Sequence, residues 1–342
     1  SDAFKQAYYA ATTTPISGGG AEIKDNSRSN NFEVNYNASD LVSGFDLQIG
    51  AQAREYVLNS GGSLFTDYDE PIKFSQLGVY TQVQRDLFNG AVKLTGSMRY
   101  DKSQYFDGQF TPRLGALVFL SENQNIRFSY QTGFMNPSTQ DQYIALDVVS
   151  AVLMGSSPDS IDRFRMSFTG SNFNEYTVTG DMVMNNGLIF QDYLTGTITP
   201  AQLKPVEPQH VISREFGYRL NGKKVSVDLS AHWSTFNNFI AAKQVVVPYY
   251  GDVSNLGQGG GSSALAALVN NDFRVFSVDN NTEEVVTTMG VNVGLETKID
   301  KLDFGATFSY NEMDQSRVDP NFTTFFNTPK IRTKFTLGST EI

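Results

Sequence analysis

The sequence predicts an all-β protein, an antiparallel transmembrane β-barrel of which residues 1–342 form a partial barrel with about 11–12 strands. Three observations lead to this fold class. Long segments alternate apolar and polar residues, the connections between them alternate between short and long, and aromatic residues gather near the segment ends. The longest apolar runs, such as 245–247, fall far short of the ~20 residues of a spanning helix, whereas a barrel strand needs only ~9–11.

The alternation has a period of two, which is the period of a strand with one apolar and one polar face. In the segment 91–100, Leu94 and Met98 face one way while Lys93 and Arg99 face the other. No helical period of 3.6 separates such segments, so a βαβ architecture is not expected. The same pattern predicts strands at 30–37, 45–58, 72–85, 110–120, 126–134, 210–220, 224–234, 285–299, 302–311 and 329–338. Residues 3–11 are a candidate for a twelfth strand, with Phe4 and Tyr8 on one face.

The connections alternate in length along the chain. Short ones are expected at 37–44, 86–89, 121–125, 221–223 and 300–301, and long ones at 59–71, 101–109, about 135–209, about 236–284 and 311–328. In an antiparallel meander every second connection lies at the same rim, so one rim should carry tight turns and the other large loops. Outer-membrane barrels have this asymmetry, with short periplasmic turns and long extracellular loops. The alternative is a soluble β-sandwich, whose strands are usually shorter and whose two rims carry comparable loops.

The composition excludes several kinds of chemistry. The chain has no cysteine, two histidines and a formal net charge of −10. Disulfides, thiolate metal sites and cysteine nucleophiles are therefore excluded, and a nucleic-acid partner is not expected because no basic stripe is present. Neither His210 nor His232 lies in a nucleophile motif, and the acidic loop residues lack EF-hand spacing. We expect no enzyme, no catalytic residues, no metal and no cofactor.

A progression of residues crosses three successive predicted strands. It consists of Arg99-Tyr100-Asp101, then Phe110 to Gly115, Asn125 to Tyr130 and Gly133 to Pro137. This progression resembles the barrel of TonB-dependent outer-membrane receptors. Leu203 to Pro208 with Glu215 to Arg219 is a less complete match, because Val206 interrupts the usual Pro-Glu pair. The segments 50–51, 54–56, 59–65 and 78–82 are similar to the large-nutrient, SusC-like branch of the family.

The resemblance implies a barrel of about 22 strands, an N-terminal plug domain and a short segment that contacts TonB. Neither the plug nor that segment is found in the sequence, so we expect residues 1–342 to be part of the barrel, with the missing strands before Ser1 and after Ile342. The implied location is the bacterial outer membrane. The implied function is TonB-energised uptake of a nutrient, and the implied partners are outer-membrane lipid, TonB through the plug, the extracellular nutrient and, as an open question, a surface lipoprotein.

Arginines recur on the polar faces of the predicted strands, where they would line the lumen. Charges cost little in a water-filled lumen, whereas Arg or Lys facing lipid at mid-bilayer costs ~2–4 kcal/mol. We expect the plug-facing lumen residues to be Arg54, Arg99, Arg113 and Arg127, with the last three forming a basic patch for plug carboxylates. The alternative is a solvated lumen wall with no specific partner.

Aromatic residues in the two longest loops are candidates for ligand binding, because rings stack on sugars and on apolar ligands. The candidates are Tyr143, Phe173, Tyr176, Tyr193, Tyr249 and Tyr250. Loops of this size also need small cores of their own, which is the competing role for the same rings. The sequence does not identify the ligand. A passive diffusion pore and a surface binding protein anchored by its barrel remain alternative functions.

Overall fold

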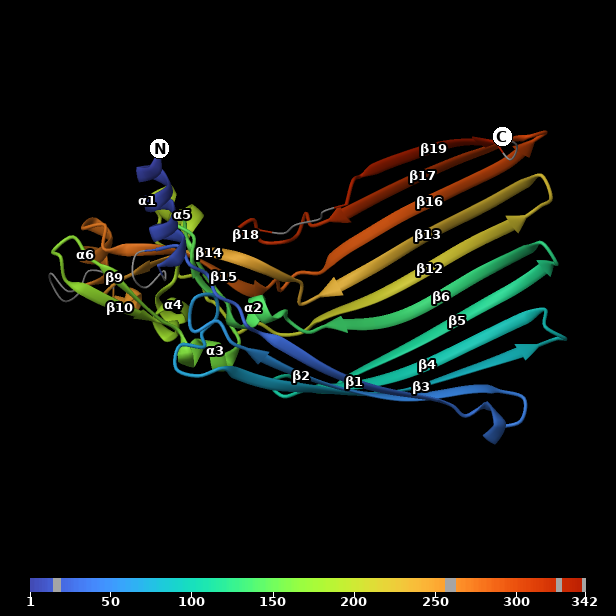
Figure 1. Cartoon of the computed structure of the whole chain (residues 1–342), viewed down its shortest axis with the longest axis horizontal. Helices are drawn as coiled ribbons and strands as arrows, with labels where there is room; N and C mark the ends of the chain where they lie inside the picture. The colour runs from blue at the N-terminus through green and yellow to red at the C-terminus, as the bar shows by residue number, and fades with distance from the viewer. Residues whose placement is uncertain (15–19, 256–262, 324–327, 340–342) are drawn as a thin grey trace.

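The computed structural model describes residues 1–14, 20–255, 263–323 and 328–339. Figure 1 shows a wide, twisted sheet of long strands and a smaller lobe of short strands and helices at one end of it. The wide sheet has eleven strands in the order β1-β2-β3-β4-β5-β6-β12-β13-β16-β17-β19. Their bounds are β1 Arg28–Asn37, β2 Asp46–Leu58, β3 Ile72–Leu87, β4 Val92–Ser103, β5 Gln109–Ser121, β6 Gln124–Met135, β12 Gln209–Asn221, β13 Val225–Asn237, β16 Val286–Ile299, β17 Leu302–Asp314 and β19 Ile331–Ser339.

All eleven strands predicted from the alternation are confirmed, and every neighbouring pair in the sheet is antiparallel. Strands that follow each other in sequence lie next to each other, apart from three insertions, which separate β6 from β12, β13 from β16, and β17 from β19. In the described residues β1 and β19 are the edges of the sheet, which is therefore a partial barrel that does not close.

The register places apolar residues of different strands in continuous rows. Phe128 of β6 lies opposite Phe216, which lies opposite Ala231, and the row continues through Val291 and Tyr310. These side chains are not covered: Phe216 is 54% exposed and Val291 is 44% exposed. The wide sheet thus has an uncovered apolar face, as a wall in contact with lipid requires.

The row displaced by one residue is polar and points to the opposite face. It contains Arg127, Gly217, Ser230, Asn292 and Ser309 on the same five strands. Asn292 Nδ2 donates a hydrogen bond to Ser230 Oγ at 3.3 Å. We call this side of the sheet the polar face. The β-sandwich alternative is wrong, because no second sheet formed by the described residues packs on the wide one to make a dry interior.

One end of the wide sheet carries only tight connections, which we call the turn end. The β3–β4 turn places Phe88, Asn89 and Gly90 at φ angles of 51°, 54° and 86°, a left-handed path that Asn and Gly tolerate best. The β16–β17 turn contains Asp300 at φ 55°. The opposite end, the loop end, carries all the long connections, as predicted from their alternation.

The two longest connections, together with β18 from the connection between β17 and β19, fold into the lobe seen at the loop end in Figure 1. Its sheet has the order β11-β14-β15-β8-β7, with β18 paired to β14, and a separate hairpin joins β9 and β10. The short strands are β7 Ala145–Asp147, β8 Val152–Met154, β9 Arg165–Thr169, β10 Glu175–Thr179, β11 Leu188–Ile189, β14 Ile240–Pro248, β15 Phe273–Asn281 and β18 Phe322–Thr323. The helices are α2 Thr139–Tyr143, α3 Pro158–Arg163, α4 Gly180–Asn186, α5 Phe190–Leu194 and α6 Ala264–Val269, with 3-10 turns η2 Ser39–Leu41, at the turn end, and η3 Val253–Asn255.

The buried core of the protein lies in this lobe. Its largest cluster includes Met154, Phe164, Val178, Val245 and Phe276, all 1% exposed or less. A second cluster joins Tyr143 of α2 to Phe74 of β3, so it fixes the lobe to the end of the wide sheet. The long loops therefore pack together into one body with a buried core of its own.

The expected twelfth strand at residues 3–11 is wrong, because Asp2–Thr13 forms helix α1. Ser1 Oγ accepts a hydrogen bond from the Phe4 amide at the N-terminus, and Asp2 lies in the first turn, where a negative charge is favoured. Phe4 and Tyr8 stack at a spacing of four residues, a helical neighbour pair. Among the described residues, none of the helices has the length and apolarity needed to span a bilayer.

Candidate functional site

The polar face carries two groups of ion-paired residues. In the first group, Arg99 Nη2 lies 2.6 Å from Asp101 Oδ1 and donates to Gln52 Oε1 at 3.0 Å. Arg99 and Asp101 are two residues apart on β4 and therefore project to the same face. The guanidinium predicted to face a plug thus already pairs with a carboxylate of its own wall.

The second group surrounds Arg127. Its Nη2 lies 2.8 Å from Asp228 Oδ1, and its Nε lies 3.5 Å from Glu215 Oε1. Arg219 also pairs with Asp228, at 2.5 Å. The four residues come from β6, β12 and β13, and the register brings their alternate positions together. These pairs are partly exposed, so each contributes only ~0–1 kcal/mol to stability but fixes where the charges lie.

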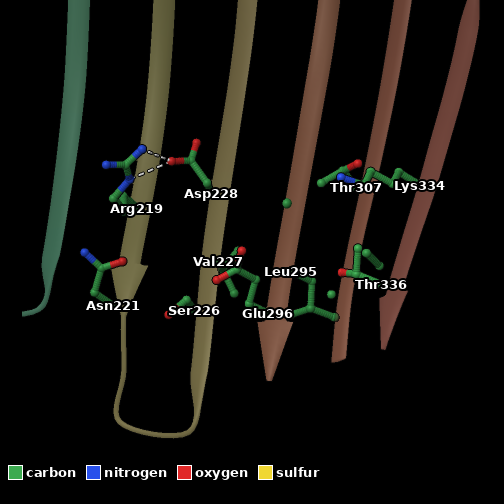
Figure 2. A pocket seen from close by; sticks show the side chains of 13 residues that line it. Arg219, Asn221, Ser226, Val227, Asp228, Leu295, Glu296, Thr307, Lys334 and Thr336 are labelled. Atoms are coloured by element: carbon green, nitrogen blue, oxygen red, sulfur yellow. Dashed lines mark hydrogen bonds and ion pairs between the residues drawn. The ribbon is translucent and has the colours of Figure 1, made fainter. Parts of the chain in front are cut away.

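A shallow hollow of about 300 Å³ lies on the polar face near the turn end. Figure 2 shows the Arg219–Asp228 pair on one side of it and Lys334 beside Thr307 on the other, with Glu296 nearer the strand ends. The lining therefore has charges of both signs, spread over β12, β13, β16, β17 and β19. This distribution is that of a solvated wall and does not select a ligand of one sign.

Two of the predicted lumen arginines have no carboxylate partner among the described residues. Arg54 Nε donates to Asn31 Oδ1 at 3.4 Å, and its Nη1 donates to Tyr56 Oη at 3.1 Å. Arg113 lies in register between Ser97 and Gln131, and in the described part of the chain its guanidinium has no hydrogen-bonding or ion-pair partner. Of the four predicted arginines, Arg99 and Arg127 are therefore paired with carboxylates. Among the described residues, Arg54 and Arg113 have no carboxylate partner.

Arg54 borders a second hollow at the loop end, about 440 Å³ in volume, which we call the loop-end hollow. One side is formed by β2 and β3, and the other by the end of β6 and the segment that leads into α2. Its lining residues are Arg54, Tyr56, Phe74, Gln76, Phe134, Asn136, Pro137, Ser138, Thr139 and Gln142. Sequence reasoning identified Arg54 but missed the rest, because segments about 80 residues apart meet only in the folded chain.

Two amide groups of the loop-end hollow have unused acceptors. Gln142 is 2% exposed, and its Nε2 donates to the Pro137 carbonyl at 2.7 Å, which leaves Oε1 as the free atom. Within the described chain, neither Gln142 Oε1 nor Asn136 Oδ1 has a hydrogen-bond partner, although both atoms are buried. Buried polar atoms are normally paired, so this arrangement is unusual.

The predicted ligand-binding aromatics have different environments. Tyr143 is fully buried in the cluster that joins the lobe to β3, and Tyr249 is 9% exposed, with its ring stacked 5.3 Å from Phe168. Phe173 is 89% exposed at the tip of the β9–β10 hairpin. Tyr193 packs against Phe273 at 5.3 Å. Of the six rings, two are therefore mainly core residues.

Tyr176 and Tyr250 form the most polar part of this set. Their ring centroids are 5.1 Å apart, and Tyr250 Oη donates to Asp272 Oδ2 at 3.0 Å. Asp272 also accepts from the Ser171 amide at 2.6 Å, and this hydrogen bond lowers the pKa of the carboxyl group. Burial raises the pKa of Tyr250. The pair presents aromatic faces next to a carboxylate that is held in its charged form.

Asp279 on β15 is the lobe carboxyl group with the largest change in acidity. Burial, with a smaller contribution from the charge of Asp141, raises its pKa to about 7. Its backbone carbonyl accepts a hydrogen bond from Ser156 Oγ, which holds the strand in place.

The part of the chain that the structure describes gives the positions of the histidine and acidic side chains. No group of three or more His, Cys, Asp or Glu side chains is arranged there to hold a metal ion. His232 lies in register between Glu215 and Gly290, and His210 lies between Phe134 and Asn237.

The wide sheet, with an uncovered apolar face, a polar face rich in charges and long connections at one end only, defines a wall segment of a transmembrane β-barrel. The model of the family "TonB dependent receptor-like, beta-barrel" matches residues 2–340. The chain belongs to this family. No curated protein matches the sequence.

Solved structures support the same fold. A variant of the ferric enterobactin receptor PfeA from Pseudomonas aeruginosa superimposes with a TM-score of 0.57 over 92% of this chain and 39% of its own length, at 13% identity. The siderophore receptor PirA from Pseudomonas aeruginosa gives a TM-score of 0.51 over 84% of this chain and 44% of its own length, at 15% identity. The chain thus spans about two fifths of the length of these structures. At such identities the likeness shows the fold alone.

Proposed function

We propose that the chain is part of the barrel of a receptor in the bacterial outer membrane, which takes up a nutrient with energy delivered by TonB. The observation that carries this proposal is the family match over residues 2–340, together with the uncovered apolar face of the eleven-stranded sheet. The apolar face contacts outer-membrane lipid, the turn end faces the periplasm and the lobe faces the outside.

The proposed partners occupy different parts of this wall. A plug domain fills the lumen and contacts TonB on the periplasmic side, while the nutrient binds at the loop end, and a surface lipoprotein that covers the lobe is a further candidate partner. The exposed ring of Phe173 and the half-buried rings of Tyr176, Tyr193 and Tyr250 are the aromatic residues with surface available to a ligand. Tyr143 and Tyr249 support these surfaces from within the lobe rather than contact the ligand.

Growth on single nutrients distinguishes this function from its two rivals. Cells with and without the complete gene would be grown on iron chelates, cobalamin, oligosaccharides or peptides as the limiting source, with and without TonB. The proposal predicts one nutrient whose use requires both the gene and TonB. A passive pore would support growth without TonB, and a barrel-anchored binding protein would support binding but no gene-dependent growth; either result would reject the proposal.

Within this function, we infer that Arg113 contacts a carboxylate of the plug. Arg99 and Arg127 have carboxylate partners in the wall, whereas Arg113 has none among the described residues. Arg113→Glu should lower uptake of the nutrient found in the growth assay at least tenfold, and Arg113→Lys should retain most of it. The control is Lys93→Glu on the adjacent strand, where Lys93 pairs with Asp86 at the turn end. Unchanged uptake by Arg113→Glu would show that this arginine is only part of a solvated wall.

A further inference from the structure

The apolar face of the wide sheet carries an arginine among its apolar side chains. Arg214 is two residues from Phe216 on β12 and therefore projects from the same face. Its register partners are Tyr130 of β6 and Trp233 of β13, on the two strands that flank β12 in Figure 1. The Arg214 Cζ atom lies 5.7 Å from the centroid of the Tyr130 ring. Among the described residues, this exposed guanidinium has no carboxylate partner and no hydrogen-bond acceptor.

The row of residues that contains Arg214 marks a boundary on the apolar face. The adjacent row toward the turn end contains Phe216 and Val291. The adjacent row toward the loop end contains the hydroxyl side chains of Thr235 and Thr287. From the Arg214 row to the turn end, β13, β16 and β17 each provide the ~9–11 residues with which a barrel strand crosses the bilayer. The row therefore lies where the hydrocarbon meets the lipid headgroups at the loop end.

The rings beside Arg214 are typical of this level of a membrane. Tyr and Trp concentrate at headgroup depth, because each ring combines an apolar body with a polar atom. Trp233 is the single tryptophan of the chain and is 59% exposed. Within the described chain, neither its indole N–H nor the Tyr130 hydroxyl has a hydrogen-bond partner. Three donor groups therefore lie on adjacent strands, and a planar guanidinium can donate two parallel N–H groups to the oxygens of a phosphate.

A shallow hollow of about 360 Å³ lies on the apolar face, and Arg214 and Trp233 form part of its lining. We call it the lipid-side hollow. Its lining also includes Ala231, a small residue that lies in register between Phe216 and Val291. A small side chain between larger ones leaves a depression that an acyl chain can fill. The lipid-side hollow thus joins an apolar depression to a cation, which is complementary to an acyl chain attached to an anionic group.

We propose that Arg214 and the lipid-side hollow form a binding site for a membrane lipid with a phosphate in its headgroup. The phosphate pairs with the Arg214 guanidinium, the Trp233 indole N–H is a further donor, and one acyl chain lies in the hollow over Ala231. This inference rests on the proposed function in one respect only, namely that the apolar face contacts outer-membrane lipid. It goes beyond that function because it assigns one chemical class of lipid to one position on the wall.

Three probes separate the two parts of the site. Dioctanoyl phosphatidate carries two acyl chains and a phosphate, dioctanoylglycerol carries the same chains without the phosphate, and inorganic phosphate carries no chain. The complete gene product would be purified in a non-ionic detergent, and the affinity of its tightest lipid-binding step would be measured by native mass spectrometry. Folding of each variant would be checked by heat-dependent migration on gels. These measurements require neither TonB nor transport.

The wild-type protein should bind the phosphatidate at least tenfold more tightly than dioctanoylglycerol. Arg214→Gln should reduce the phosphatidate affinity to that of dioctanoylglycerol. Ala231→Phe should weaken both lipids at least fivefold, because its ring fills the hollow, and Ala231→Leu gives the same test if Ala231→Phe does not fold. Arg332→Gln, which removes the same charge from the polar face beside Ser309, is the control and should leave both affinities unchanged. An excess of inorganic phosphate should not displace the phosphatidate.

Four results would overturn the site. They are equal binding of the two lipids by the wild type, unchanged phosphatidate affinity of a folded Arg214→Gln protein, unchanged binding of both lipids by a folded Ala231→Phe protein, and displacement of the phosphatidate by inorganic phosphate, which would identify a site for the free ion. Failure here together with TonB-dependent growth would reject this site and leave the proposed function intact. Lipid binding without gene-dependent growth would do the reverse.

Discussion

The two faces of the wide sheet make a quantitative prediction at neighbouring positions. Val291 and Asn292 are consecutive on β16 and project to opposite faces. Val291 lies between Ala231 and Tyr310 on the apolar face, and Asn292 donates to Ser230 on the polar face. An arginine at either position adds the same side chain to the same strand, so only the solvent that it meets differs.

The magnitudes follow from that difference in solvent. Arginine on the lipid face near mid-bilayer costs ~2–4 kcal/mol. Arginine at position 292 removes the 3.3 Å hydrogen bond from Asn292 to Ser230, which costs about 1 kcal/mol, and its charge is solvated in the lumen. Val291→Arg should therefore lower the free energy of unfolding by ~1–3 kcal/mol more than Asn292→Arg does. This corresponds to a factor of roughly 5 to 150 in the ratio of folded to unfolded protein.

The assay is urea unfolding of the complete gene product in phospholipid vesicles, followed by gel migration. Val291→Leu is the control, since it keeps the position apolar and should change stability by less than about 1 kcal/mol. Equal destabilisation by Val291→Arg and Asn292→Arg would refute the reasoning, because it would show that both faces meet the same solvent. Greater destabilisation by Asn292→Arg would reverse the assignment of the faces.

Two further predictions concern the lobe and its connection to the sheet. Asp279 keeps its proton in the folded lobe up to pH about 7 but loses it above about 4 when unfolded, so stability should fall as pH rises between these values, by about 2 kcal/mol after allowance for solvent access. Asp279→Asn should remove that slope in thermal unfolding curves, whereas persistence of the slope would assign it to another group. Asp67 is 2% exposed and accepts hydrogen bonds from the amides of Gly61 and Gly62 at 2.9 and 3.0 Å, so Asp67→Ala should destabilise the loop 59–71 by about 3 kcal/mol. Proteolysis within 59–71 should then be faster than in Asp69→Ala, and equal rates would contradict the role of this carboxylate.

The wide sheet could be predicted from the sequence because each of its strands meets two different solvents. One face is uncovered and apolar and the other is polar. Apolar and polar residues therefore alternate along each strand, as at Leu94 and Lys93. The strands of the lobe lack this signal. Val245, Val246 and Val247 on β14 are all fully buried, so consecutive residues of that strand are apolar and no period of two appears.

Helix α1 shows the opposite case, because residues 3–11 alternate in polarity as a strand would and yet form a helix. Phe4 and Tyr8 satisfy a period of two, but they also satisfy a spacing of four, and the sequence pattern alone does not separate these readings. The side chain of Ser1, which accepts from the Phe4 amide, favours the helix. The helix-capping residue was therefore the more informative signal in this segment.

The arginines of the polar face could be predicted as residues but not as a site. Arg127 and Asp228 are 101 residues apart, and their pairing depends on the register of three strands. Local alternation gives the face of each side chain, but it does not give which residues of different strands lie at the same height. Which arginines are paired with carboxylates therefore depends on how the strands align in the fold.

The position of Tyr143 explains how a lobe built from loops is fixed to the barrel wall. Its ring lies 5.7 Å from Phe74 on β3, and the preceding residue, Gln142, lines the loop-end hollow. The packing that buries Tyr143 therefore also fixes Gln142 relative to Arg54. The burial of Tyr143 against Phe74 thus fixes the lobe to the end of the wide sheet.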